Sequence, residues 1–123
     1  MTDAEIRQLL DELASLRENS AHREVVAKVQ GISDLSSIRA GLRFPLVEMG
    51  SASCVALGEH ATATELLKKL GKKTVEDYKI LAGLASTFLA LEKFEDAEHM
   101  CLLAGEAKRS QEARRKARGR RSE

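Results

Sequence analysis

The sequence predicts an all-α protein built from short antiparallel helix pairs, and three observations lead to this. Ala, Leu, Glu, Lys and Arg, all strong helix formers, dominate the 123 residues. Apolar residues recur at spacings of three and four, which places them on one face of a helix. Eight Gly and one Pro are too few turn signals for a sandwich or barrel. With 43% apolar and 32% charged residues, the chain has the balance of one modest globular domain.

The first part of the chain contains three predicted helices. Residues 3–18 carry an apolar stripe, and the pair Thr2-Asp3 offers side chains that can cap the start. The polar pair Asn19-Ser20 interrupts this pattern. The stripe resumes over residues 21–32, and the stop signals that follow leave residues 35–43 as a short helix.

Four more helices are predicted after these. Pro45 suits the first turn of a helix, where its missing N–H group is not needed, so this helix should run to about Leu57. Gly58 then turns the chain. Thr74, with Asp77 three residues on, resembles a capping box with Asp in place of Glu. The remaining helices cover residues 60–70, 75–91 and 95–108.

An internal repeat of 34 residues relates two of these helix pairs. Shifting the sequence by 34 positions superposes residues 47–71 on residues 81–105, and the apolar and small positions match throughout. A fixed period of this length indicates a helical repeat protein, in which each unit buries its apolar face against its neighbours. The clearest matches are Ser51 on Ala85, Leu57 on Leu91, Ala63 on Ala97 and Gly71 on Gly105.

This pattern resembles the tetratricopeptide repeat, a unit of 34 residues and two antiparallel helices. The family places a small residue in the middle of the first helix, where Ser51 and Ala85 stand. It places an aromatic residue after the turn, where Phe94 fits and His60 is a weak substitute. The resemblance implies that this aromatic packs between the helices. It also implies that a small residue in the second helix is followed, four residues on, by a larger one. Those places hold Ala63 and Ala97, then Leu67 and Cys101.

The resemblance implies a short solenoid of about three repeats with a basic end. Residues 1–110 form the tetratricopeptide-like domain. Within it, residues 1–43 fit only as a degenerate repeat that needs about five extra residues before the next. Two better repeats follow at 44–77 and 78–110, and residues 111–123 form a basic C-terminal tail.

Repeats of this family form a concave surface lined by the first helix of each pair. In this chain the surface is small and apolar at its centre, which suits the apolar face of a partner's helix. Val55 and Leu89 have an alternative role, which is to pack against the chain's own helices. The Lys and Asn clamp that some members use for acidic tails is missing. The expected groove residues are Leu10, Ala14, Glu48, Ala52, Val55, Ala56, Lys79, Ala82, Ser86 and Leu89.

At the level of class, the chain is also similar to the small bacterial chaperones of type III secretion. The shared features are size, a degenerate first repeat, an apolar concave face and a polar start without signal-peptide character. The likeness implies a cytoplasmic chaperone or adaptor that shields an amphipathic helix of another protein. It also implies a hetero-complex with a small co-chaperone.

The net charge of +1 conceals two regions of opposite sign. Residues 1–107 hold 12 basic and 17 acidic residues, which gives −5, and residues 108–123 hold 8 and 2, which gives +6. The basic end has three interpretations: a solvated end of the last helix, a contact for an acidic protein surface, or a contact for nucleic acid or an anionic membrane. Nucleic acid is disfavoured because this end has no aromatic residue for base stacking. The basic residues are Lys108, Arg109, Arg114, Arg115, Lys116, Arg118, Arg120 and Arg121.

The sequence offers no catalytic, metal or cofactor motif. The three histidines fall in or beside second helices at repeat-related places, and no glycine-rich phosphate loop occurs. Cys54 and Cys101 lie outside metal and redox spacings, so both are expected to be small buried apolar residues. No apolar run approaches the ~20 residues of a membrane span. A binding module is therefore favoured over an enzyme, with a basic-tail nucleic-acid binder and a self-associating scaffold subunit as the alternatives.

Overall fold

The computed structural model describes residues 2–70 and 77–121, without the side chains of residues 110, 111 and 114–121. Within these residues the chain is all-helical, as the sequence predicts. It divides into two compact units, residues 1–74 and residues 75–123. This division falls close to the predicted boundary between the repeats 44–77 and 78–110.

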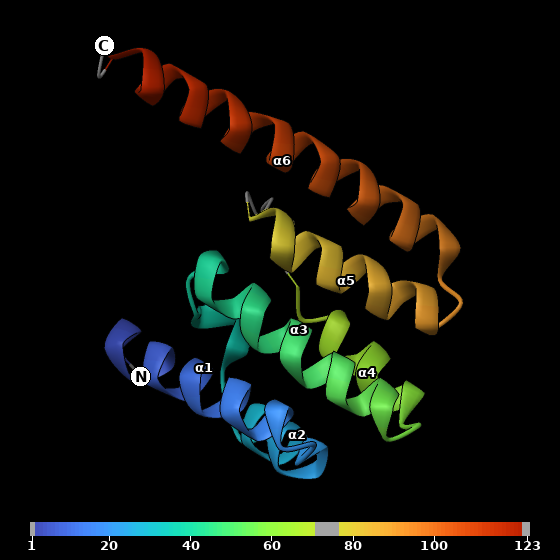
Figure 1. Cartoon of the computed structure of the whole chain (residues 1–123). Helices are drawn as coiled ribbons and strands as arrows, with labels where there is room; N and C mark the ends of the chain where they lie inside the picture. The colour runs from blue at the N-terminus through green and yellow to red at the C-terminus, as the bar shows by residue number, and fades with distance from the viewer. Residues whose placement is uncertain (1, 71–76, 122–123) are drawn as a thin grey trace. The chain divides into compact units, whose positions relative to one another are not determined.

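The first unit is built around one central helix. α3 (Ala40–Ala56) contacts three neighbours, which are α1 (Asp3–Glu18), α2 (His22–Gln30) and α4 (His60–Leu67). α1 also contacts α2. Figure 1 shows this group in blue to green. Its core consists of side chains with almost no exposed surface, among them Leu13, Val25, Val29, Leu46, Val47, Cys54 and Leu66.

The second unit is a helical hairpin of α5 (Tyr78–Ala90) and α6 (Phe94–Arg121). The two helices run antiparallel, and α6 continues well past the start of α5 (Figure 1). At about 1.5 Å per residue, the 28 residues of α6 span roughly 42 Å against roughly 20 Å for the 13 residues of α5. The buried apolar residues of this unit are Leu81, Leu84, Ala85, Phe88 and Ala97.

The start of α1 is as predicted. Thr2 is the N-cap residue, and its hydroxyl oxygen accepts a hydrogen bond from the backbone N–H of Glu5 at 3.2 Å. The Glu5 carboxylate in turn accepts one from the backbone N–H of Thr2 at 3.2 Å. These reciprocal bonds give partners to two backbone N–H groups that have none within the helix. They also lower the pKa of Glu5.

Two predicted helix boundaries are wrong in the segment before α3. Only Leu35–Ser37 of the expected helix 35–43 is helical, as one 3-10 turn (η1). α3 begins at Ala40, so Pro45 lies inside this helix and not in its first turn. The earlier start is stabilised by burial of Leu42 and Phe44. It is also stabilised because Arg43 Nη1 donates to the carbonyl oxygens of Ser36 and Ile38, at 3.1 and 3.3 Å.

The three turns within helix pairs have the same backbone construction. Each places one residue in the left-handed region, with φ of 58° at Ser20, 77° at Gly58 and 61° at Glu92. The N–H of the following residue donates to the carbonyl oxygen five residues earlier, at 2.8 to 2.9 Å. This is the Schellman arrangement that closes a helix end. Gly58 and Glu92 are 34 positions apart, whereas Ser20 and Gly58 are 38 apart.

The start of α5 differs from the prediction. Asp77 is the N-cap residue, and its carboxylate accepts a hydrogen bond from the backbone N–H of Lys79 at 2.9 Å. It is therefore the cap itself and not the third residue of a capping box. The expected cap Thr74, and residues 75 and 76 of the predicted helix, lie outside the described residues.

Candidate protein-binding groove

The second unit carries an apolar groove between its two helices. Its volume is about 530 Å3. From α5 it is lined by Ala82, Ser86 and Leu89, which are predicted groove residues, because spacings of four and three place them on one face. We call this feature the α5–α6 groove, and its lining is Ala82, Ala85, Ser86, Leu89, Phe94, Ala97, Glu98, Cys101 and Ala104.

Small side chains create the groove, and two large ones border it. Ala85 and Ala97 are buried and do not fill the space between the helices as larger side chains would. Leu89 and Phe94 are 58% and 63% exposed, although both are large and apolar. Such exposure is costly in water, because each of these side chains is worth about 1.5–3 kcal/mol when fully buried. The groove therefore has a surface that gains free energy when another apolar surface covers it.

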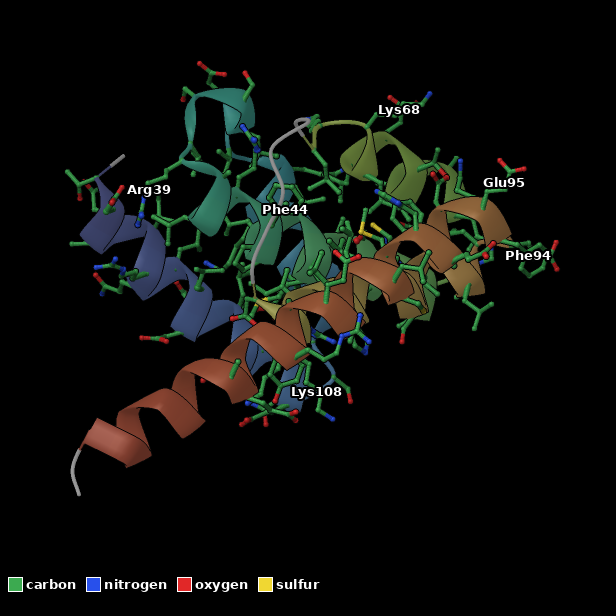
Figure 2. All side chains as sticks on the ribbon, turned by 90° about the horizontal axis from the view of Figure 1, so that it is seen from above. Arg39, Phe44, Lys68, Phe94, Glu95 and Lys108 are labelled. Atoms are coloured by element: carbon green, nitrogen blue, oxygen red, sulfur yellow. The ribbon has the colours of Figure 1, made fainter. Side chains whose placement is uncertain are left out.

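Two residues of the last helix differ from what the sequence predicts. Phe94 is the first residue of α6 (Figure 2), where it lines the groove and is largely exposed, so it does not pack between helices. Cys101 is exposed and not buried, and it lines the groove together with Ala97 and Ala104. Cys54 is buried as predicted. Its pKa is raised by burial and, to a smaller extent, by the nearby negative charge of Glu59.

The sequence prediction missed the α6 side of the groove. It assigned the surface to the first helix of each pair only, so Phe94, Ala97, Glu98 and Ala104 were not expected there. Their recurrence every three to four residues is a signal that could have identified this face.

The first unit places the other predicted residues along α1 and α3. Leu10, Ala14, Ala52 and Val55 are half-buried, and Ala56 is exposed. None of these five residues lines the α5–α6 groove. The predicted groove residues therefore divide between two units, and those of α5, Ala82, Ser86 and Leu89, line the α5–α6 groove.

An ion pair links the predicted faces of α1 and α3. Arg17 Nη1 lies 3.4 Å from Glu48 Oε2, and the Glu48 side chain is only 15% exposed. Burial raises the pKa of Glu48, and the positive charge of Arg17 opposes that rise. The pair shows that Glu48 faces another helix of its own unit, so its carboxylate is engaged within the fold.

Lys79 and the basic residues lie outside the groove lining. Lys79 is exposed on the first turn of α5. Lys108 and Arg109 are exposed on α6, one turn beyond Ala104. The other six basic residues lie at positions 114–121, where the backbone of α6 is helical and the side chains are outside the description.

A second hollow, in the first unit, has a mixed polar and apolar lining in which two cations are paired with carboxylates. It has a volume of about 590 Å3 and lies between α1, the end of α2 and residues 31–39. Two cations that line it already have carboxylate partners: Arg39 with Asp3 at 3.3 Å and Lys28 with Glu12 at 3.1 Å. These two cations are therefore already paired within the unit itself.

One histidine links two helices of the first unit. His22 Nδ1 lies 3.2 Å from Ser53 Oγ, which links α2 to α3. No group of three or more His, Cys, Asp or Glu among the described residues could hold a metal ion. None of the described helices has both the length and the apolar character needed to cross a bilayer. Comparisons with family models, curated proteins and solved structures find no match for this chain.

Proposed function

We propose that this chain is a non-catalytic protein-binding module whose α5–α6 groove holds the apolar face of an amphipathic helix from another protein. The observation that carries this proposal is the groove itself, with its small apolar floor and its exposed Leu89 and Phe94. A partner helix with apolar residues at i, i+3, i+4 and i+7 presents a matching stripe. Burial of this stripe, at about 25 cal/mol per Å2, supplies affinity without a charged hot spot.

The fold we propose is of the tetratricopeptide type. The turns at Gly58 and Glu92 share one hydrogen-bond pattern and stand 34 residues apart, which is the period of that repeat. The turn at Ser20 has the same pattern, with four extra residues before the next, which suits a degenerate first repeat. Stacking of the three helix pairs into a solenoid stays a prediction.

Within this class, we propose a role similar to that of a small secretion chaperone. A groove with small side chains can shield a helix that would otherwise associate with its own kind. Such a role places the chain in the cytoplasm, where the partner is made, and is compatible with a further small co-chaperone. No cofactor or metal is needed for it.

The groove is tested with a fluorescent amphipathic peptide of about five helical turns, with Leu on one face and Lys or Glu on the other. We expect a rise in anisotropy when the full chain is added. Because Arg cannot be accommodated without burying its charge, Ala82→Arg should weaken binding at least about tenfold.

Two controls make this experiment decisive. Ala90→Arg is the same substitution on α5, at an exposed position that does not line the groove, so binding should stay within about twofold of wild type. A peptide of equal composition with a scrambled pattern should not bind. Circular dichroism checks that both variants stay helical.

Undiminished binding by Ala82→Arg would exclude the groove as the binding site. Ala52→Arg, tested in parallel, shows whether the predicted face of the first unit contributes.

A further inference from the structure

α6 has opposite charges at its two ends. Residues 92–98 contain four acidic residues and one Lys, whereas residues 108–121 contain eight basic residues and one Glu. The acidic side chains are exposed, as are Lys108 and Arg109. Figure 2 shows Phe94 and Glu95 at the start of the helix and Lys108 farther along it. The helix is therefore acidic at its N-terminal end and basic at its C-terminal end.

The side of α6 that faces the groove continues into the basic end. Phe94, Ala97, Cys101 and Ala104 follow one another at spacings of three and four, and the next position in this series is Lys108. α5 is shorter than α6, so it does not accompany this stripe to the end of the helix. An apolar stripe thus runs from the carboxylate of Glu98 towards exposed cations.

We propose that a second copy of this chain docks on the α5–α6 groove, with the two α6 helices antiparallel about a two-fold axis near residues 101–105. In this arrangement the acidic end of each helix meets the basic end of the other. If the two helices cross at residue 103, position 98 of one copy lies opposite position 108 of the other, because both positions are five residues from the crossing. A parallel pairing would bring like charges together at both ends, and this is unfavourable.

On the side of α6 that faces the groove, the residues near the proposed crossing leave room for close approach. Ala97, Cys101, Ala104 and Gly105 are all small. A Cβ atom placed on Gly105 would meet no other atom within 4 Å, apart from its own helix backbone and chain neighbours. Two helices can therefore approach to the short interaxial distance of about 8 Å that small contact residues permit. The exposed Leu89 and Phe94 at the edges of the groove would then be covered by the second copy.

The arrangement is tested by sedimentation of the full chain over a range of concentrations and by two matched charge reversals. Lys108→Glu/Arg109→Glu reverses the two cations nearest the proposed crossing, and Glu95→Lys/Glu98→Lys reverses two of the carboxylates that face the basic end of the other copy. We expect each variant alone to dimerise at least about tenfold more weakly than wild type, because attractive pairs become repulsive at both ends. A mixture of the two variants should dimerise as well as wild type, since opposite charges then meet at both ends. Higher salt should weaken the wild-type dimer.

Cys101 supplies an independent readout near the crossing. A short bismaleimide reagent should link two copies of the wild-type chain, because the two Cys101 thiols come close together. Cys101→Ser should abolish the linked species, since Cys54 is buried. A monomer at all concentrations would overturn the inference, as would a dimer that both charge reversals leave unchanged.

This inference rests on the proposed function only in that both use the same groove. A chain that stays monomeric but binds the amphipathic peptide would refute the dimer and leave the proposed function intact. A chain that dimerises as described but binds no peptide, even when diluted to monomer, would refute the proposed function and support the dimer. If both hold, the peptide should dissociate the dimer.

Discussion

At the residue scale, the buried carboxylate of Glu48 makes stability depend on pH. Its pKa is raised by burial, so the native state holds this proton more tightly than the unfolded chain does. A raised pKa contributes stability below the unfolded value near 4.5, and this contribution is lost as pH rises through the folded value. We therefore expect Glu48→Gln to gain stability relative to wild type between about pH 4 and pH 7, as measured by urea unfolding.

Arg17 gives this prediction its control. Its guanidinium lies beside Glu48 and opposes the rise in pKa. Arg17→Gln should therefore raise the pKa further and steepen the loss of stability with pH. The double variant Arg17→Gln/Glu48→Gln should show neither effect. A wild-type curve parallel to that of Glu48→Gln over this pH range would contradict the role of burial.

Gly50 lies where α3 closely approaches α2 and α4. A Cβ atom there would lie 3.0 Å from Val29 Cγ1 and 3.1 Å from Leu66 Cδ1. Both neighbours are fully packed, so they have little room to move. We expect Gly50→Ala to lower the free energy of unfolding by about 1 kcal/mol, because overpacking outweighs the gain in helix propensity.

Gly41 is the matched control for Gly50 on the same helix. A Cβ atom there would meet nothing within 4 Å. Gly41→Ala should therefore raise the free energy of unfolding by up to about 0.5–1 kcal/mol. Thermal or urea unfolding of the two variants compares the effects directly. Equal shifts in both would show that close packing at Gly50 is unimportant.

At the scale of the element, the bounds of a helix could be predicted where capping residues and apolar periodicity agreed. They could not be predicted where packing against other residues fixed them. Thr2 and the stripe after it define α1 from sequence alone, because cap and periodicity coincide. The start of α3 predicted from Pro45 is wrong, because the position of Pro45 inside the helix depends on Arg43 and on buried Leu42 and Phe44. These are tertiary contacts that no local rule contains.

The turns give the prediction that belongs to this scale. Glu92 and Gly58 occupy the same place in equivalent turns, but Glu92 has a side chain at φ 61°. Non-glycine residues pay about 1 kcal/mol or more for this conformation. Glu92→Gly should therefore raise the free energy of unfolding of the second unit by about 1 kcal/mol, and Gly58→Ala should lower that of the first by a similar amount.

Urea unfolding measures both turn variants, and Glu92→Ala separates two causes. If the gain in Glu92→Gly comes from backbone conformation, Glu92→Ala should not share it. If both variants gain equally, loss of the carboxylate is the cause and the strain argument fails.

At the scale of the whole molecule, the sequence predicted one side of the groove and missed the other. Ala82, Ser86 and Leu89 follow from the repeat register, which assigns first-helix positions to a face. The α6 side depends on how far that helix extends and on which of its residues α5 covers. Exposed Phe94 and Cys101 show this dependence, since the sequence predicts that Phe94 packs between helices and that Cys101 is buried.

The two units should differ in stability, and Tyr78 can report on one of them. The first unit has a core shared by four helices, whereas the second is a two-helix hairpin with a smaller core. Tyr78 is the only tyrosine, there is no Trp, and it lies in α5. We expect its fluorescence to change at a lower urea concentration than the main loss of helical circular dichroism.

The same probe connects stability with the proposed dimer. If a second copy covers the α5–α6 groove, mass action should move the Tyr78 transition to higher urea as protein concentration rises, while the main dichroism transition stays fixed. Lys108→Glu/Arg109→Glu should remove this concentration dependence, because it weakens the dimer without touching the hairpin core. Coincident transitions that do not depend on concentration would show that the units unfold together and that the groove is not covered by a second copy.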